Sequence, residues 1–472
     1  MQKRDADRYD AVIIGAGIGG LVCGCYLAKA GLKVLIAEQH AKPGGYCTSF
    51  RRGGFTFDAA AHSFGGYRDG GLVNRVFRTF AINELISIAR YDPSDSIVTP
   101  DYHVSFWADV ARTTEDFRSA FPHEHRALKD FFDFLIAPDP LSLAHMRKWT
   151  MKQLLDKYFR DQHLKSILAF PLFGNGGLPP SQMSAFIGIN IFREFMLDGG
   201  YYPNDRMQSL PDAFAARFRE YGGDLKLSAH VDTITVKDGK AEGIRIKGER
   251  FYPAKYVIAN CDTRQTCLLL IKGQTIHEAF ITMIKKMVPS LSMFIAYLGL
   301  NKDIDMLPLP GSNIWFLSEY DLDKAYSAAQ KGDLFGIDRF MVRVLPGKKC
   351  IMALVNSSFK NKHFWQQNKK NYLHLFMKSI ERTVIPGLTS AVSFCDAATP
   401  MTLFRYTLNY RGAAYGWAST PAQIANTDFR LSTIIKNLYS VGHWTTQGLG
   451  IPGVIYSAYD TAQRILKRKD TV

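Results

Sequence analysis

The chain has 472 residues, 47% of them hydrophobic and 21% charged, a composition that indicates a folded globular protein with two or three domains. No run of about 18 apolar residues occurs, so the sequence predicts no segment that spans a bilayer. The seven cysteines show neither C-x-x-C spacing nor a cluster with histidine, so neither a disulfide framework nor a metal site is expected.

The chain is basic, with 58 Lys and Arg against 43 Asp and Glu and a formal net charge of +15, so an anionic partner is expected. The basic residues are scattered apart from Lys467, Arg468 and Lys469, and no nucleic-acid-binding motif is present, which favours anionic lipid headgroups over nucleic acid. Residues 1–10 lack the apolar segment of a secretory signal. We therefore expect a cytoplasmic protein that associates peripherally with an anionic membrane surface.

The first predicted elements form a dinucleotide-binding βαβ unit. Residues 9–14 are an apolar, β-branched run typical of a buried parallel strand, and the turn Gly15-Ala16-Gly17-Ile18-Gly19-Gly20 follows directly. Gly15 permits a tight turn, Gly17 lets the backbone approach a pyrophosphate, and Gly20 lets the next helix pack closely on the strand. The helix N-terminus then presents free N–H groups to the phosphates.

The remainder of this unit supplies an acid for the ribose. The helix is predicted from Leu21 to about Ala30 with Gly31 as its C-cap, and a second strand over residues 33–37 leads to Glu38. A carboxylate at this distance from the glycines accepts hydrogen bonds from ribose hydroxyls and argues against a 2′-phosphate. Strand, glycines, helix, second strand and acid together predict an adenine dinucleotide site.

A second pair of glycines, Gly44-Gly45, is followed by the stretch GFTFDAAAH over residues 54–62. This part of the chain resembles the phytoene desaturase, carotenoid isomerase and retinol saturase superfamily of FAD enzymes. In that superfamily the Gly-Gly pair and a G-x-x-F-D-x-x-x-H/S stretch lie along the flavin. The resemblance implies FAD as the cofactor.

The resemblance continues over most of the chain. Residues 437–454 (NLYSVGHWTTQGLGIPGV) are similar to the superfamily's C-terminal flavin motif, with Gln447 where proline is common and His443 where related flavoproteins have Asp or Ala. In such a motif, glycines beside a helix N-terminus bring backbone N–H groups to the flavin or its ribityl chain. Residues 199–210, 224–234, 256–262 and 399–417 also resemble superfamily elements, and Val231 stands where a backbone group meets the adenine.

The distribution of these motifs predicts the fold class α/β, with a discontinuous Rossmann-like FAD-binding domain and an antiparallel-sheet plus helical substrate domain. We assign residues 8–85, 201–272 and 426–472 to the FAD-binding domain. Residues 86–111 and 273–425 are assigned to the substrate-binding sheet domain, and residues 112–200 to a helical, membrane-proximal domain. Within the helical domain the glycines and prolines of residues 174–180 predict a loop.

Lysines and aromatic residues alternate over residues 360–383 in a basic amphipathic pattern. The pattern fits either an ordinary surface helix packed on the core or an interfacial membrane helix. The sequence leaves both alternatives open.

The fingerprint and the resemblance together assign a set of residues to cofactor binding. These are Gly15, Ala16, Gly17, Ile18, Gly19, Gly20, Glu38, Gln39, Gly44, Gly45, Tyr46, His62, Ser63, Val231, Gly442, His443, Ile451, Pro452, Gly453 and Val454. The catalytic candidates are His62, Tyr415 and Arg411. His62 could serve as acid or base at neutral pH or only line the flavin, and Tyr415 could be part of an apolar wall.

The expected activity is FAD-dependent redox chemistry on C–C and C=C bonds of a long apolar isoprenoid polyene, with a phytoene-like desaturase as the first choice. In desaturation the cofactor carries the difficult step, which fits a sequence without a catalytic triad, metal cluster or paired carboxylates. A cis-trans isomerase or a saturase that uses reduced FAD is the alternative. A non-enzymatic prenyl carrier of the GDP dissociation inhibitor type is a third.

Overall fold

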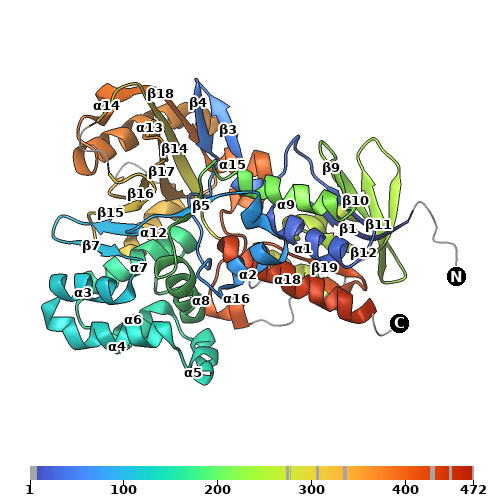
Figure 1. Ribbon diagram of the computed structural model, residues 1–472, viewed down its shortest axis with the longest axis horizontal. Coiled ribbons are helices and arrows are strands. Elements are labelled where there is room, and N and C mark those ends of the chain that lie inside the picture. Colours follow the sequence, from blue (N-terminus) through green and yellow to red (C-terminus); the bar gives the residue numbers. More distant parts are fainter. Residues whose placement is uncertain are drawn as a thin grey trace.

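The computed structural model describes residues 8–272, 276, 278–304, 308–332, 337–425, 431–445 and 449–469. It is a mixed α/β molecule with two large sheets side by side and a group of helices next to the second sheet (Figure 1). The predicted α/β fold class is confirmed. Residues 446–448 of the C-terminal motif and the side chains of Arg468 and Lys469 lie outside the described residues, as do residues 1–7.

The first sheet contains the predicted βαβ unit. Its parallel core has the order β9-β2-β1-β12-β19, and β11, β10 and β13 extend it beyond β12. Strand β12 belongs to both the parallel core and the antiparallel extension, because its first residues pair with β11 and its last residues pair with β19. The strands are β1 (Tyr9–Ile14), β2 (Val34–Ala37), β9 (Asp224–Lys226), β10 (Val231–Lys237), β11 (Lys240–Ile246), β12 (Phe251–Ala259), β13 (Ile271–Lys272) and β19 (Leu438–Ser440).

Both faces of this sheet are buried, which explains why β1 reads as a continuous apolar run. Ala11 and Ile13 pack on the helical face, and Val12 and Ile14 pack on the other face. The helical face is covered by α1 (Ile18–Lys29), α2 (Leu72–Thr79), α9 (Ser209–Glu220) and α18 (Gly450–Lys469). Helix α1 begins at Ile18, earlier than the predicted Leu21, because Gly17 already has the extended backbone of an N-cap.

The second sheet has the order β18-β14-β17-β16-β15-β6-β7. Its strands are β6 (Asp95–Val98), β7 (His103–Phe106), β14 (Ser292–Leu300), β15 (Asn313–Leu317), β16 (Arg339–Val344), β17 (Cys350–Ser357) and β18 (Val392–Ala398). The antiparallel sheet predicted for the substrate domain is confirmed for β14 to β17, whereas β15 pairs with β6 in parallel. Met293 and Ile295 of β14 face the helical group, and Phe294 and Ala296 face the opposite side.

Helix α13 (Lys362–Thr383) covers that opposite side of the second sheet (Figure 1). Its apolar residues Trp365, Tyr372, Phe376 and Ile380 are buried against β14 and β16. An interfacial membrane helix needs a free apolar face, so the surface-helix alternative is correct for this segment.

The helical group consists of α3 (Val110–Ala120), α4 (His125–Ile136), α5 (Pro140–His145), α6 (Met151–Tyr158), α7 (Gln162–Gly176) and α8 (Ala185–Ile191). The loop predicted for residues 174–180 is wrong at its start, because α7 continues to Gly176 and ends at Gly177 in the left-handed conformation. Gly174 is needed for packing, since a Cβ at this position would lie 2.1 Å from the Trp315 ring.

The remaining elements connect these layers. They are β3 (Ser49–Arg52), β4 (Phe55–Asp58), β5 (Ile88–Arg90), β8 (Tyr201–Pro203), α10 (Thr263–Gln265), α11 (Glu278–Lys286), α12 (Leu322–Lys331), α14 (Leu388–Ala391), α15 (Pro400–Thr407), α16 (Pro421–Ala425) and α17 (Leu431–Ile434). Among the described residues, no helix combines the length and hydropathy needed to cross a membrane. The assigned domain limits stay a prediction.

Candidate functional site

A large cavity opens where the two sheets meet, with about 1700 Å³ of space not filled by protein atoms, including the part open to solvent. Residues from the βαβ unit, the second glycine pair, the second sheet and the C-terminal motif all line it.

The glycine turn after β1 packs around one side chain, Asn260, at the end of β12. The Asn260 amide donates to the Gly15 carbonyl at 3.1 Å. A Cβ on Gly17 would lie 3.1 Å from the Asn260 amide nitrogen, and a Cβ on Gly442 would lie 2.6 Å from its amide oxygen. Three distant chain segments therefore meet at Asn260, and their glycines leave room for its side chain.

The N-terminus of α1 is open toward the cavity. Its N-cap Gly17 supplies no side-chain cap, and the first turn contains no acidic residue, so its N–H groups and positive dipole end remain available to an anion. The second glycine pair closes over this turn, because Gly44 N–H donates to the Ala16 carbonyl at 2.9 Å. Gly44 has φ 133°, a conformation that side chains other than glycine rarely adopt.

Glu38 ends β2 at the edge of the cavity and is buried. Its two carboxylate oxygens accept backbone hydrogen bonds, one from Ala16 N–H at 2.7 Å and one from His40 N–H at 2.9 Å. The carboxylate therefore holds the glycine turn in place, and the same side chain lines the cavity.

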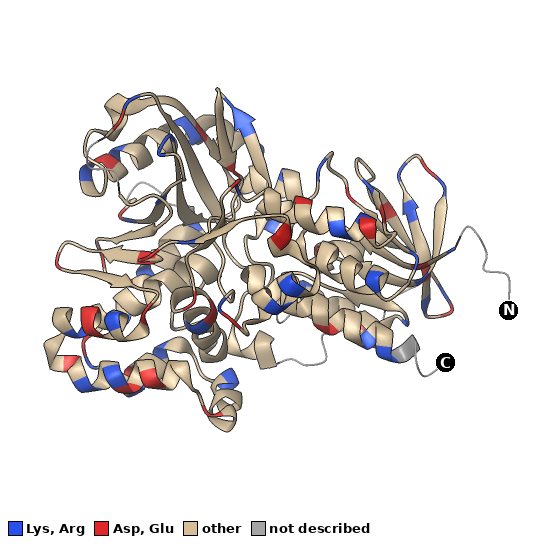
Figure 2. Ribbon diagram, viewed as in Figure 1, with Lys and Arg blue, Asp and Glu red and all other residues tan. Residues whose placement is uncertain are grey.

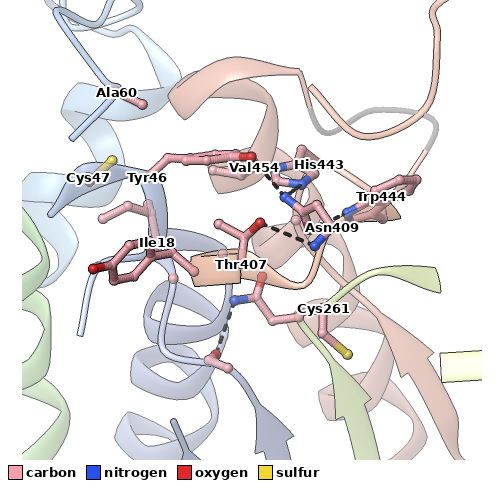
Figure 3. A pocket seen from close by; sticks show the side chains of 18 of the residues that line it. Ile18, Tyr46, Cys47, Ala60, Cys261, Thr407, Asn409, His443, Trp444 and Val454 are labelled. Carbon is pink, nitrogen blue, oxygen red and sulfur yellow. Dashed lines mark hydrogen bonds between the residues drawn. The ribbon is translucent and has the colours of Figure 1, made fainter. Parts of the chain in front are cut away.

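The opposite wall carries a polar cluster formed by Tyr46, Asn409, His443 and Trp444 (Figure 3). The Asn409 amide nitrogen lies 3.2 Å from the Tyr46 hydroxyl and 3.2 Å from His443 Nε2, and Trp444 Nε1 donates to Asn409 Oδ1 at 2.8 Å. The Tyr46 and His443 rings stack at 5.8 Å. Burial lowers the pKa of His443 to about 4, so this histidine is neutral at neutral pH.

Most of the predicted cofactor residues line the cavity. These are Gly15, Gly17, Ile18, Gly19, Glu38, Gln39, Gly44, Gly45, Tyr46, His62, Ser63, Val231, Gly442, His443, Ile451 and Val454. Ala16 and Gly20 lie behind the lining, where Ala16 bonds to Glu38 and a Cβ on Gly20 would meet the Gly15 carbonyl oxygen at 2.2 Å. Pro452 and Gly453 lie in the first turn of α18 outside the lining.

The three catalytic candidates differ in position. Arg411 is exposed beside the Tyr410 ring and does not line the cavity, which corrects the expectation that it acts there. Its φ of 54° belongs to a tight turn that leaves the side chain at the surface. Tyr415 lines the cavity and donates to the Gly174 carbonyl at 3.2 Å, and burial raises the pKa of its hydroxyl.

His62 lies in the cavity wall, but its environment opposes the acid or base role considered from the sequence. Burial and the nearby Arg343 guanidinium lower the pKa of His62 to about 3. The imidazolium is therefore absent at neutral pH, and the neutral ring is a weak base.

Several lining residues were missed by the sequence reasoning. They include His40, Asn175, Phe195, Asn260, Met293, Ile295, Leu354, Leu403, Tyr406, Asn409 and Trp444. Asn260 and Trp444 stand inside motifs that were recognised, so those motifs carried a usable signal. The apolar residues of β14 and β17 carried none, because an alternating strand reads the same whether its face meets a core or a cavity.

A model of the flavin-containing amine oxidoreductase family matches residues 18–466. The chain belongs to this family. FAD is therefore its cofactor, and the chain is an FAD-dependent oxidoreductase. The open α1 N-terminus, the glycine cradle around Asn260 and the Glu38 carboxylate fit the diphosphate and ribose of FAD.

Curated relatives cover the superfamily that the sequence predicted. The chain is 25% identical to a chloroplastic prolycopene isomerase of Arabidopsis thaliana, over 98% of this chain and 84% of the relative. It is 26% identical to a neurosporene-forming phytoene desaturase of Rhodobacter capsulatus (98% and 95%). It is 24% identical to an all-trans-retinol 13,14-reductase of Danio rerio (99% and 88%).

Solved structures show the same fold. An oxidoreductase of Methanosarcina mazei has a TM-score of 0.67 at 18% identity, covering 96% of this chain and 99% of that chain. A putrescine oxidase bound to putrescine also has a TM-score of 0.67, at 14% identity, covering 98% and 99%.

Proposed function

We propose that this FAD-dependent oxidoreductase desaturates a long apolar isoprenoid polyene. The observation that carries the proposal is the apolar wall of the cavity formed by the second sheet, α15 and the turn after α8, which is lined by Phe195, Met293, Ile295, Leu354 and Leu403. A wall of this kind suits a hydrocarbon chain and excludes water from it. Relatives that act on carotenoids support the same substrate class.

The protein itself needs to position the substrate against the cofactor and to keep water out of the cavity. FAD would supply the hydride acceptor when bound, and water or another weak base would take the proton from the neighbouring carbon. The described residues hold no group of three or more His, Cys, Asp or Glu that could bind a metal ion. Holding the polyene against the cofactor in a dry cavity is therefore the contribution that the geometry supports.

Isomerisation and saturation remain the second candidate, because relatives named as a prolycopene isomerase and a retinol reductase match over the same length as the desaturases. The prenyl-carrier alternative is dropped, because the chain belongs to a flavin-containing oxidoreductase family.

The direction of the redox step is tested by the colour of the flavin. In anaerobic single turnover, a desaturase substrate such as phytoene must bleach the oxidised FAD band and yield a red-shifted polyene, with turnover resuming on addition of oxygen or a quinone. An isomerase instead requires reduced FAD and returns it unchanged, and a saturase consumes it in proportion to product. If oxidised enzyme leaves every polyene unchanged while reduced enzyme isomerises a cis-polyene, the desaturase assignment is wrong.

We also propose that the tip of the helical group contacts the membrane from which an apolar substrate must come. Ile136 and Leu141 are 51% and 80% exposed near α5, and Arg147 and Lys148 are exposed just beyond them. Exposed apolar side chains flanked by cations suit an anionic lipid surface. Lys and Arg are interspersed with acidic residues over the molecule (Figure 2), and Asp133 and Asp139 are exposed beside this tip as well, so the exposed apolar side chains carry this proposal.

Cosedimentation with anionic liposomes tests this contact. We expect binding at low salt that weakens as salt is added, because surface charges are screened within about 8 Å at physiological ionic strength. The double change Ile136→Ser, Leu141→Ser should reduce binding, whereas Leu269→Ser, at another exposed leucine, should not. Equal reduction by both variants would point away from the α5 tip.

A further inference from the structure

Behind His62 lies a buried polar cluster that the redox proposal does not use. Asn313 begins β15, Asp95 begins the adjacent β6, and Arg343 lies opposite on β16. All three side chains are fully buried. The Asn313 amide donates to Asp95 Oδ1 at 2.8 Å, and Arg343 donates to Asn313 Oδ1 at 3.0 Å.

These two neighbours fix which way the Asn313 amide points. Arg343 can only donate hydrogen bonds and the Asp95 carboxylate only accepts them, so the amide oxygen must face Arg343 and the amide nitrogen must face Asp95. In a flipped amide, the Asn313 N–H₂ donor would face the Arg343 donor, and the Asn313 oxygen would face the Asp95 carboxylate oxygen.

The orientation of Asn313 in turn decides the tautomer of His62. Asn313 Oδ1 lies 3.1 Å from His62 Nδ1, and an oxygen in this position can only accept. Nδ1 therefore carries the proton, and Nε2 carries a lone pair. The Ser63 hydroxyl, 3.2 Å from His62 Nδ1, accepts from the same N–H.

His62 Nε2 is left as an unfilled acceptor in the cavity wall. His62 is 7% exposed and lines the cavity. The Asn175 side chain on α7 also lies beside the ring and raises its pKa, but its amide nitrogen donates to the Pro171 carbonyl at 3.0 Å, and Nε2 makes no hydrogen bond of normal length to any residue in the part of the chain that the structure describes. The charged and titratable groups that face the ring are Arg343 on β16, Asp95 behind Asn313 and Tyr415 across the cavity. Arg343 opposes a positive charge on the ring, so His62 stays a neutral acceptor.

We propose that Asn313 is a positioning residue that holds His62 in one tautomer, so that Nε2 accepts a hydrogen bond from an N–H or O–H donor bound in the cavity. The donor is either a flavin ring N–H or a hydroxyl group on the polyene. This inference rests on the proposed function only where the donor is a hydroxyl group of the polyene substrate. A pure hydrocarbon without help from the flavin would leave Nε2 buried and unpaired, at a cost of about 5- to 150-fold in affinity.

The tautomer is measured on the FAD-loaded protein labelled with ¹⁵N-histidine, with the His62 signals assigned from their loss in His62→Gln. We expect a proton on Nδ1, an unprotonated Nε2, and no titration between pH 5 and 8. In Asn313→Leu the second tautomer should appear. Asn356→Leu is the control, because Asn356 lies on the neighbouring β17 and bonds to the Phe173 carbonyl. A proton on Nε2 in the wild type, or a mixture of tautomers unaffected by Asn313→Leu, overturns the proposal.

Two further arms identify the donor from the shift of Nε2. The cofactor is tested by comparing the apoprotein with the FAD-loaded protein and then reducing the flavin with dithionite, because oxidised flavin already carries one ring N–H and reduction adds others. A shift of Nε2 in this arm alone assigns the donor to the cofactor. The substrate is tested by adding a polyene alcohol or the matching hydrocarbon. If only the alcohol shifts Nε2, binds at least about fivefold more tightly than the hydrocarbon, and loses this advantage in Asn313→Leu, the donor is the hydroxyl. No response in either arm overturns the acceptor role. None of these readouts requires desaturation, so a failed redox proposal would be recognised separately.

Discussion

Replacing Glu38 by alanine is expected to weaken FAD binding by about 1.5–3 kcal/mol, a roughly 10- to 150-fold rise in Kd. The change removes the carboxylate that faces the ribose position, and it also leaves the Ala16 and His40 N–H groups without their acceptor. Because Ala16 lies inside the glycine turn, the loss should loosen the turn that receives the diphosphate. Titration of the apoprotein with FAD, followed by flavin fluorescence, measures the effect.

Asp10→Ala is the matched control for this change. Asp10 is also a carboxylate of the first sheet that accepts a backbone hydrogen bond, from Lys33 N–H at 2.9 Å, but it lies at the other end of β1 and does not line the cavity. Glu38→Gln should give an intermediate loss, because its single amide oxygen can satisfy only one of the two N–H donors. Unchanged FAD affinity in Glu38→Ala would show that this carboxylate does not hold the cofactor.

Replacing Asp58 by alanine is expected to lower the free energy of unfolding by about 2–4 kcal/mol, because three buried donors would lose their acceptor. Asp58 is fully buried at the end of β4, and its carboxylate accepts from Ser49 Oγ at 2.6 Å, from Met207 N–H at 3.1 Å and from the Tyr202 hydroxyl. It thereby ties residues 49–58 to residues 202–207, far along the chain. The variant should show a lower midpoint in both thermal and urea unfolding.

Two comparison variants separate the loss of the buried hydrogen bonds of Asp58 from the loss of a negative charge as causes of the lower stability. Asp69→Ala removes an acid whose side chain is 89% exposed, paired only with Arg78, and should change stability by less than about 0.5 kcal/mol. Asp58→Asn keeps one acceptor oxygen and should fall between the two. A stability of Asp58→Ala close to that of Asp69→Ala would mean that the three hydrogen bonds contribute little.

The sequence by itself determined the local units. The β1-turn-α1-β2 unit and Glu38 were placed correctly because their contacts are made between residues close in the chain, and each step follows from local conformational preference. The glycines at 44 and 45 and the C-terminal motif were recognised through resemblance, and the described part of that motif does reach the cavity.

Only the tertiary structure decided what surrounds those units. The Asn260 side chain crowds both Gly17 and Gly442, although neither position is near it in sequence. In the same way, the glycine at position 174 is explained by its contact with the Trp315 ring and not by a turn. Arg411 has a left-handed backbone conformation, and its side chain lies outside the cavity. Local propensity could not show any of these contacts.

The clearest case is His62. From the sequence His62 is a candidate acid or base beside the flavin, because the ordinary imidazole pKa is about 6.5. The fold buries it and brings Arg343 and Asn313 beside it from strands far along the chain, which lowers its pKa to about 3. The sequence alone shows that a histidine stands at position 62. Its charge and its tautomer, and therefore its chemistry, are set by residues that pack against it from distant parts of the chain.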